Sequence, residues 1–125
     1  MIIELAYPDM SLMPNRKNGR HWGATKGAKD SAFSEAFYRT KMAMTGQKFR
    51  DDKIALTITF VQNDKRHRDL DNLLACVKSK IDGVSRAIGV DDKLFEPITI
   101  KRGYNKSQSA TVIELSQEKQ ERLAA

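Results

Sequence analysis

An alternating pattern in residues 53–61 is the feature that most restricts how this chain can fold. Ile54, Leu56, Ile58 and Phe60 fall on one face, and Ala55, Thr57 and Thr59 fall on the other. A period of two residues is typical of a strand with one buried face. We therefore expect this segment to be a half-buried strand in a sheet.

A helical stripe follows the strand. Its apolar residues recur at the spacing of one helix face, which predicts a helix over residues 70–88: Leu70, Leu74, Val77, Ile81, Val84 and Ile88. Gly89 can cap its C-terminus. An earlier helix is predicted over residues 29–44, which contain no Gly or Pro and repeat apolar residues at spacings of three and four.

Three more strands complete the predicted architecture, over residues 2–7, 97–104 and 110–115. The last two flank the turn sequence NKSQS and are expected to pair as a hairpin. The tail after residue 115 is expected to be a short polar helix or a frayed end. A chain of 125 residues suits one domain. We therefore predict a single α+β domain over residues 1–125, in which two main helices pack against a mixed sheet of about four strands.

The charge of the chain favours an acidic partner. Lys and Arg together number 22, against 16 Asp and Glu, and the sequence pI is about 9.6. Nucleic acid is the commonest acidic partner of such a protein, and general solubility is the alternative explanation. Basic residues dominate residues 1–50, whereas carboxylates gather in residues 51–100. This distribution predicts a basic binding surface and a separate acidic group.

Cysteine content and hydropathy indicate a cytoplasmic location. The single cysteine, Cys76, cannot form an internal disulfide, which fits a reducing compartment. The first residues lack the features of a signal peptide. No run of about 18 apolar residues occurs, so we expect no membrane span.

Asp69, Asp71 and the pair Asp91 and Asp92 are the candidate metal ligands. Residues two apart at the end of a strand point the same way, so Asp69 and Asp71 can converge on one cation. Carboxylates without a cation would repel one another, and Mg²⁺ suits oxygen ligands. Taken singly, DLDN is better explained by a helix N-cap and DD by an ordinary turn, but together, in a basic protein, they favour a site. An EF-hand is excluded because its required Gly and Glu are replaced by Leu74 and Lys80.

The predicted second helix adds Lys78 to this group. On a continuous helix Asp71, Lys78 and Asp82 lie within about 20° of one line. The Lys78 ammonium could then stabilise charge at a scissile phosphate, although a solvated lysine explains it equally well. Asp82 is interpreted as a salt-bridge or helix-surface residue.

The region that contains these carboxylates resembles a known family. The segment RDLDNLLACVKSKIDGVSRAIGVDD, from Arg68 to Asp92, is similar to the signature of RusA-type Holliday-junction resolvases. The signature combines a D-x-D-N start to a helix, a lysine within it, a small residue before a short apolar turn, and a closing D-D. The opening loop, with Pro14, Asn15, Arg20, His21 and Trp22, resembles the basic opening of that family.

The resemblance implies a metal-dependent crossover junction endodeoxyribonuclease. Asp69, Asp71 and Asp92 would bind catalytic Mg²⁺, which Mn²⁺ could replace, with Asp91 as a further candidate ligand. The ion would orient water, polarise the phosphate and stabilise the leaving oxygen. The family usually has a lysine three residues after the motif Asn, whereas this chain has Ala75 there and Lys78 one turn later.

The family also implies a homodimer that makes paired cuts in a four-way DNA junction during recombination and repair. No small-molecule cofactor is expected, and a prophage origin is what the resemblance suggests. The candidate phosphate-binding residues are Arg16, Lys17, Arg20, Arg66 and Arg68.

Some residues and functions keep alternative interpretations. Trp22 either stacks on a base or fills the core, which is the preferred interpretation. His21 and His67 are interpreted as phosphate or surface contacts in preference to acid–base groups. The alternative functions are a metal nuclease for other branched or structured nucleic acid and a non-catalytic DNA-binding module.

Overall fold

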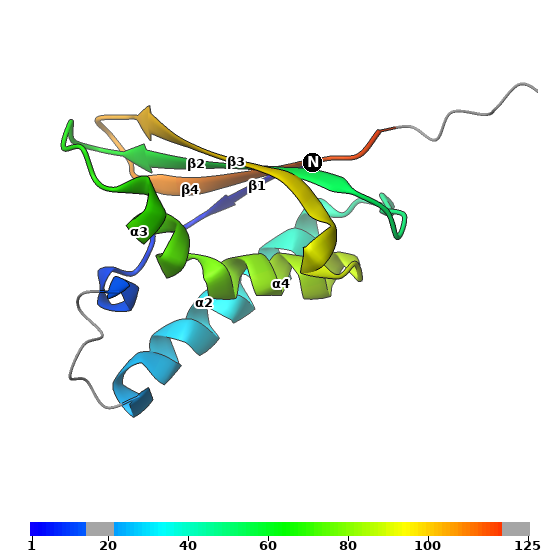
Figure 1. Cartoon of the computed structure of the whole chain (residues 1–125), viewed down its shortest axis with the longest axis horizontal. Helices are drawn as coiled ribbons and strands as arrows, with labels where there is room; N and C mark the ends of the chain where they lie inside the picture. Colours follow the sequence, from blue (N-terminus) through cyan, green and yellow to red (C-terminus); the bar gives the residue numbers. More distant parts are fainter. Residues whose placement is uncertain (15–21, 119–125) are drawn as a thin grey trace, which may run out of the picture.

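The computed structural model describes residues 1–14 and 22–118. Its elements are β1 (Ile2–Leu5), η1 (Met10–Leu12), α2 (Trp22–Ala43), β2 (Ile54–Gln62), α3 (Leu70–Cys76), α4 (Lys78–Ile88), η2 (Asp92–Leu94), β3 (Phe95–Tyr104) and β4 (Ala110–Ser116). The helices lie on one side of a four-stranded mixed sheet (Figure 1). The predicted α+β class is therefore confirmed. None of the helices in the described ranges is both long enough and apolar enough to cross a membrane.

The sheet has the strand order β1-β4-β2-β3, so β1 and β3 are its edges. β2 runs parallel to β3 and antiparallel to β4. The alternation in β2 buries Leu56, Ile58 and Phe60 completely or nearly so. These residues form one core with the inner face of β4 and with the helices. The helices leave the opposite face of the sheet uncovered (Figure 1).

The predicted hairpin of the last two strands is wrong. β3 and β4 do not pair, because β2 lies between them and hydrogen-bonds to both. The turn sequence after Tyr104 therefore carries the chain across the end of β2, where the Asn105 N–H donates to the Gln62 carbonyl at 2.9 Å. A turn signal brings two strands close together but does not determine which strands pair. The long apolar strand β2 takes an inner position between β4 and β3, where it can be buried.

The predicted single helix over residues 70–88 is also wrong, because the chain bends at Val77. Val77 has φ −105° and ψ 10°, which ends α3, and α4 begins at the next residue. Its side chain is fully buried. The bend lets α3 contact β3 while α4 packs on α2. α3 and α4 pack against different elements, and this packing determines the local structure more strongly than the continuous apolar stripe does. The predicted line through Asp71, Lys78 and Asp82 therefore does not exist.

The other predicted boundaries differ in smaller ways. The first helix begins at Trp22 rather than residue 29, so it includes Gly23 and Gly27, which lie outside the predicted helix. The N-terminal strand ends at Leu5 instead of residue 7. β2, β3 and β4 agree with the predicted strands to within two residues. The residues after 118 lie outside the described part, so the prediction for the tail stays open.

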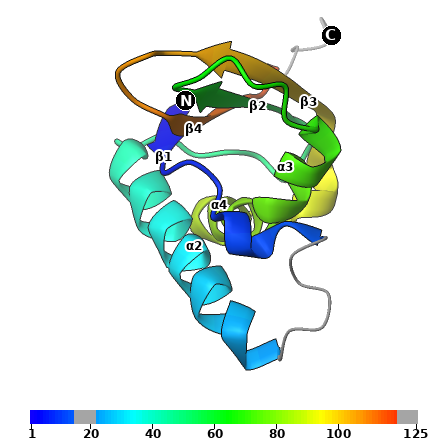
Figure 2. The same ribbon diagram turned by 90° about the vertical axis from the view of Figure 1, so that its left-hand side faces the viewer.

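Gly83 allows α2 and α4 to approach closely. Figure 2 looks along α4 and shows α2 crossing it. A Cβ added at Gly83 would lie 2.5 Å from the Phe33 carbonyl oxygen and 3.0 Å from the Ala36 Cβ. Both contacts are with the facing helix. The nearest is with a backbone oxygen, which cannot move away by a change of side-chain rotamer. Any larger residue at position 83 must therefore push the two helices apart.

We expect Gly83→Ala to destabilise the protein by about 2 kcal/mol, because overpacking a tight helix contact costs more than the gain in helix propensity. Gly27 provides a matched control in α2, since an added Cβ there meets nothing within 4 Å. Gly27→Ala should stabilise the protein by roughly 0.5–1 kcal/mol. Denaturant unfolding measures both changes. Equal changes of the same sign in the free energies of unfolding of the two variants would contradict the close contact between α2 and α4.

Candidate functional site

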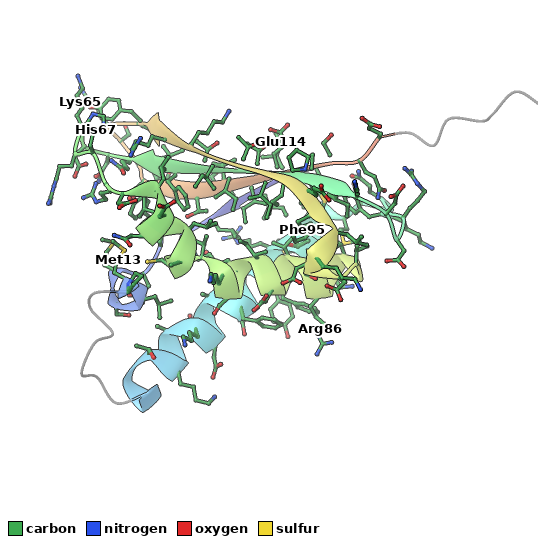
Figure 3. All side chains as sticks on the ribbon, in the orientation of Figure 1. Met13, Lys65, His67, Arg86, Phe95 and Glu114 are labelled. Carbon is green, nitrogen blue, oxygen red and sulfur yellow. The ribbon has the colours of Figure 1, made fainter. Side chains whose placement is uncertain are left out.

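The candidate site residues divide between the two ends of the β2–β3 pair. Because these strands are parallel, the loop after β2 and the C-terminal end of β3 lie at one end, and the turn before β3 lies at the other. Figure 3 shows Lys65 and His67 at the first end and Phe95 at the opposite end. Asp69 and Asp71 belong to the first end, at the start of α3. Asp92 belongs to the second, three residues before Phe95.

Asp69 and Asp71 sit at the exposed N-terminus of α3 rather than at the end of a strand. Asp69 is the N-cap, and its Oδ1 accepts a hydrogen bond from the Asp71 backbone N–H at 3.0 Å. The capping interpretation is therefore confirmed. The Asp71 carboxylate makes no hydrogen bond or ion pair with a described residue. Capping uses only Oδ1 of Asp69, so the pair still offers other carboxylate oxygens to a ligand.

These two carboxylates fit a magnesium ion by their chemistry. Mg²⁺ prefers oxygen donors and is commonly held by one or two protein carboxylates, with water and substrate phosphate as the other ligands. Asp69 and Asp71 are both exposed, so a phosphate could reach them. The chemistry of these two donors therefore fits a Mg²⁺ ion that takes its other ligands from water or a phosphate.

Asp92 lies in a different group of carboxylates. Asp82, Asp91 and Asp92 line an open pocket of about 520 Å³ beside Phe33 of α2. Partial burial raises the pKa of Asp92, and hydrogen bonding with Asp91 and the charge of Asp82 raise it further. Asp91 caps η2, and the hydrogen bond from the Lys93 backbone N–H lowers the pKa of its carboxyl group. The turn interpretation of Asp91 is therefore confirmed.

Within one chain, the structure does not bring Asp69, Asp71 and Asp92 together. α4 separates the two groups along the chain, and its 11 residues span roughly 16 Å. In residues 1–14 and 22–118, no three His, Cys, Asp or Glu side chains are grouped closely enough to hold one metal ion. The three-aspartate metal site stays a prediction. Arg16, Lys17, Arg20 and His21 lie outside the described residues, as does the side chain of Trp22.

Arg68 stabilises the loop between β2 and α3. Its guanidinium donates to both carboxylate oxygens of Asp64, at 2.8 and 3.2 Å, and lies 6.0 Å from the centroid of the Tyr7 ring. Tyr7 in turn donates to Gln62, whose amide donates to the Arg66 carbonyl at 2.6 Å. Arg68 is thus engaged in supporting the loop, whereas the Arg66 side chain is exposed. Of the two, Arg66 is the better phosphate-binding candidate.

The Arg68–Asp64 pair predicts a pH-dependent contribution to stability. The hydrogen bond from Arg68 is the main cause that lowers the pKa of Asp64 below its usual 3.8. A carboxyl group whose pKa falls on folding stabilises the protein above the unfolded-state pKa, and this stability is lost as pH drops through the folded-state value.

Asp64→Asn should therefore lower the melting temperature at neutral pH, and this loss should shrink as pH falls through the lowered folded-state pKa of Asp64. Thermal unfolding as a function of pH measures the difference. In an Arg68→Met background, Asp64→Asn should have little effect at any pH. If Asp64→Asn lowers the melting temperature at neutral pH equally in the Arg68→Met background, the Arg68–Asp64 pair is not the cause of the loss.

Sequence reasoning missed several residues at the Asp69 end of the sheet. The Arg102 Nε and Nη2 donate to the Arg68 carbonyl at 3.2 and 2.9 Å, which joins β3 to the residue before Asp69. The Lys65 ammonium lies 5.6 Å from the centroid of the Tyr104 ring. The expected β3–β4 hairpin gave no reason to connect β3 with this loop. Parallel pairing of β2 and β3 would have provided the connection.

Lys78 and Asp82 are both exposed on α4, as expected for a solvated lysine and a helix-surface residue. Lys78 is the first residue of α4, is exposed, and makes no ion pair with a described residue. Asp82 is exposed on α4, in agreement with a helix-surface residue, but its neighbour is Asp92 rather than Asp71. The bend at Val77 removes the line through Asp71, Lys78 and Asp82 that a continuous helix predicts.

The sequence was also compared with known proteins. It matches no protein-family model and no curated protein.

Proposed function

We propose that this protein is a Mg²⁺-dependent endonuclease that cuts branched DNA, of the kind represented by the RusA-type junction resolvases. One observation carries the proposal: the exposed carboxylates of Asp69 and Asp71 lie at the same end of the sheet as Lys65, Arg66 and Arg102. A nuclease needs cations that hold the phosphate backbone beside carboxylates that hold a metal ion. The net charge of +6 also favours a polyanionic substrate.

Each residue has a definite role in this proposal. Asp69 and Asp71 would hold Mg²⁺ at the start of α3. When bound, the ion would polarise a phosphate oxygen and lower the pKa of a bound water molecule. Arg66 and Arg102 would bind the flanking phosphates and so fix the scissile bond over the carboxylates. Lys78 is available as a further cation, at the first residue of α4.

We include a homodimer in this proposal, because paired cuts in a four-way junction need two sites related by symmetry. The resemblance assigns Asp92 to the metal site, yet Asp92 lies at the other end of β3 within one chain. This separation favours a contribution from Asp92 of the partner subunit. The dimer would act in the cytoplasm, where its DNA substrate is found.

Subunit mixing tests the origin of Asp92. Asp71→Asn and Asp92→Asn should each inactivate a homodimer. If each site combines Asp71 of one chain with Asp92 of the other, a mixed dimer has one intact site and nicks one strand of the junction. If both residues act within one chain, every site in the mixed dimer is defective. Absence of nicking after mixing would therefore assign Asp92 to the same chain as Asp71.

Cleavage of a synthetic four-way junction tests the function itself. The wild-type protein is incubated with the junction or with a linear duplex of the same sequence, with Mg²⁺ or with EDTA. We expect symmetrical paired cuts in the junction alone, and only with Mg²⁺. Equal cutting of the duplex would leave a nuclease without junction selectivity.

A non-catalytic DNA-binding module is the second candidate. The observations in its favour are that capping accounts for Asp69 and that Asp92 lies apart from Asp69 and Asp71. This alternative predicts tight junction binding without cleavage in Mg²⁺ or Mn²⁺. The same junction assay therefore decides between the two functions.

A further inference from the structure

A groove with an aromatic wall lies beside the proposed metal site. It has a volume of about 400 Å³ and is bounded by the β2–α3 loop and the C-terminal end of β3. This size falls within the range of small-ligand pockets, roughly 300–1,000 Å³. Lys65, Arg66, His67, Arg102 and Tyr104 contribute to its lining. The groove therefore combines one exposed aromatic ring with several basic side chains.

Tyr104 is held in an exposed position by the backbone around it. It pairs with Gln62 in the parallel β2–β3 ladder, and the next residue, Asn105, donates its N–H to the Gln62 carbonyl. The Tyr104 side chain is nevertheless 53% exposed. A large, exposed ring on a fixed strand is a suitable surface on which a nucleobase can stack.

The charges around the ring suit the phosphates of a single strand. The Lys65 ammonium lies 5.6 Å from the ring centroid. Arg102 is oriented by its hydrogen bonds to the Arg68 carbonyl, and the Gln62 amide fixes the Arg66 carbonyl. The one carboxylate in the lining, Asp64, is paired with Arg68. Lys65, Arg66 and Arg102 therefore give the groove an excess of positive charge.

We propose that this groove binds an unpaired nucleotide of the DNA substrate, with the base stacked on Tyr104 and the neighbouring phosphates on Lys65, Arg66 and Arg102. The identity of the ligand as DNA rests on the proposed function. Arg102 connects the groove to the metal site, because the carbonyl that it binds belongs to the residue before Asp69. Base pairs beside a branch point open more readily than those inside a continuous duplex, so the groove would select a distorted junction over a regular duplex.

Fluorescence anisotropy with labelled oligonucleotides tests the proposal in EDTA, so that no cleavage occurs. We expect Tyr104→Ala to weaken binding to a single-stranded oligothymidine by about 5- to 150-fold, the range for loss of one base–aromatic stack. Binding to a blunt duplex should change much less. Tyr104→Phe should retain wild-type affinity, because it keeps the ring. Tyr38→Ala removes another exposed tyrosine, on α2, which is 65% exposed, and should have no effect.

Two further readouts identify the contacts. A 2-aminopurine at an unpaired position should be quenched by the wild-type protein but not by Tyr104→Ala. Lys65→Gln should reduce the slope of log affinity against log salt by about 0.7 for a single strand, the value for one lost phosphate contact. Thermal unfolding of each variant checks that it is folded.

The possible outcomes separate this inference from the proposed function. Unchanged single-strand binding by Tyr104→Ala, or an equal loss for duplex, would overturn the stacking site. If the wild-type protein nevertheless cut junctions, the proposed function would remain supported without the stacking site. Selective loss of single-strand binding in a protein that cuts nothing would support the groove and remove the endonuclease proposal.

Discussion

Asp71→Asn should abolish Mg²⁺-dependent junction cleavage, with a fall in rate of at least about a hundredfold. Loss of residues that only support a metal ligand already costs 10- to 100-fold, so loss of a ligand should cost more. Asparagine keeps the size of the side chain and removes its charge. Because Asp71 is exposed and its carboxylate makes no hydrogen bond or ion pair with a described residue, stability should hardly change. Single-turnover cleavage measures the rate, and thermal unfolding checks the fold.

Asp51→Asn is the matched control for this experiment. Asp51 is an exposed carboxylate just before β2, at the opposite end of that strand from Asp71. It undergoes the same change in charge, so any general effect on DNA affinity should appear in both variants. Cleavage by Asp71→Asn at the wild-type rate would remove Asp71 from the metal site.

Lys80→Met should lower the free energy of unfolding by about 3 kcal/mol, or the melting temperature by about 10 °C. Lys80 is 3% exposed, although lysine is rarely buried. Its ammonium donates to the Ala6 carbonyl at 2.6 Å and to Glu35 Oε1 at 3.0 Å. Glu35 Oε2 also accepts from the Ala6 N–H at 2.8 Å. One ammonium therefore joins α4 to α2 and to the end of β1.

Methionine fills a similar volume, so the expected loss comes from the Glu35 Oε1 and the Ala6 carbonyl, which both lose the ammonium, while Glu35 Oε2 keeps its hydrogen bond from the Ala6 N–H. We place it at the lower end of the range for a broken buried pair, because the Glu35 side chain is 29% exposed. Lys26→Met breaks an exposed pair with Asp30 on the same helix as Glu35 and should cost less than about 1 kcal/mol. Denaturant unfolding compares the two variants. Equal losses would contradict the bridging role of Lys80.

Much of the fold could be predicted from local sequence patterns. The alternation of Ile54, Leu56, Ile58 and Phe60 identified β2, because a half-buried strand buries every second residue. The class of fold followed from the order of such patterns. Strand pairing and the bend at Val77 could not be predicted, because both depend on contacts between residues far apart in the chain. Nothing in the apolar stripe distinguishes one helix from two helices with different packing partners.

The site was less predictable than the fold. The pattern D-x-D-N located Asp69 and Asp71 at the start of a helix, which local chemistry determines through the N-cap. The surroundings of Asp92 depend on where α4 ends relative to α2, which one sequence does not reveal. Lys80 appeared as one more charged residue, since only the fold buries it. Tyr104 and Arg102 became candidates only when β3 was found beside β2.

The position of β3 at the edge of the sheet has a consequence for solubility. Backbone N–H and C=O groups on the outer side of an edge strand have no partner in the sheet and can recruit a strand from another molecule, which leads to aggregation. β3 carries Pro97, which lacks an N–H, and the charged residues Lys101 and Arg102. Proline and charge on an edge both oppose such pairing. Arg102 would thus protect the protein from self-association as well as bind DNA, and variants designed to weaken DNA binding could become prone to aggregate.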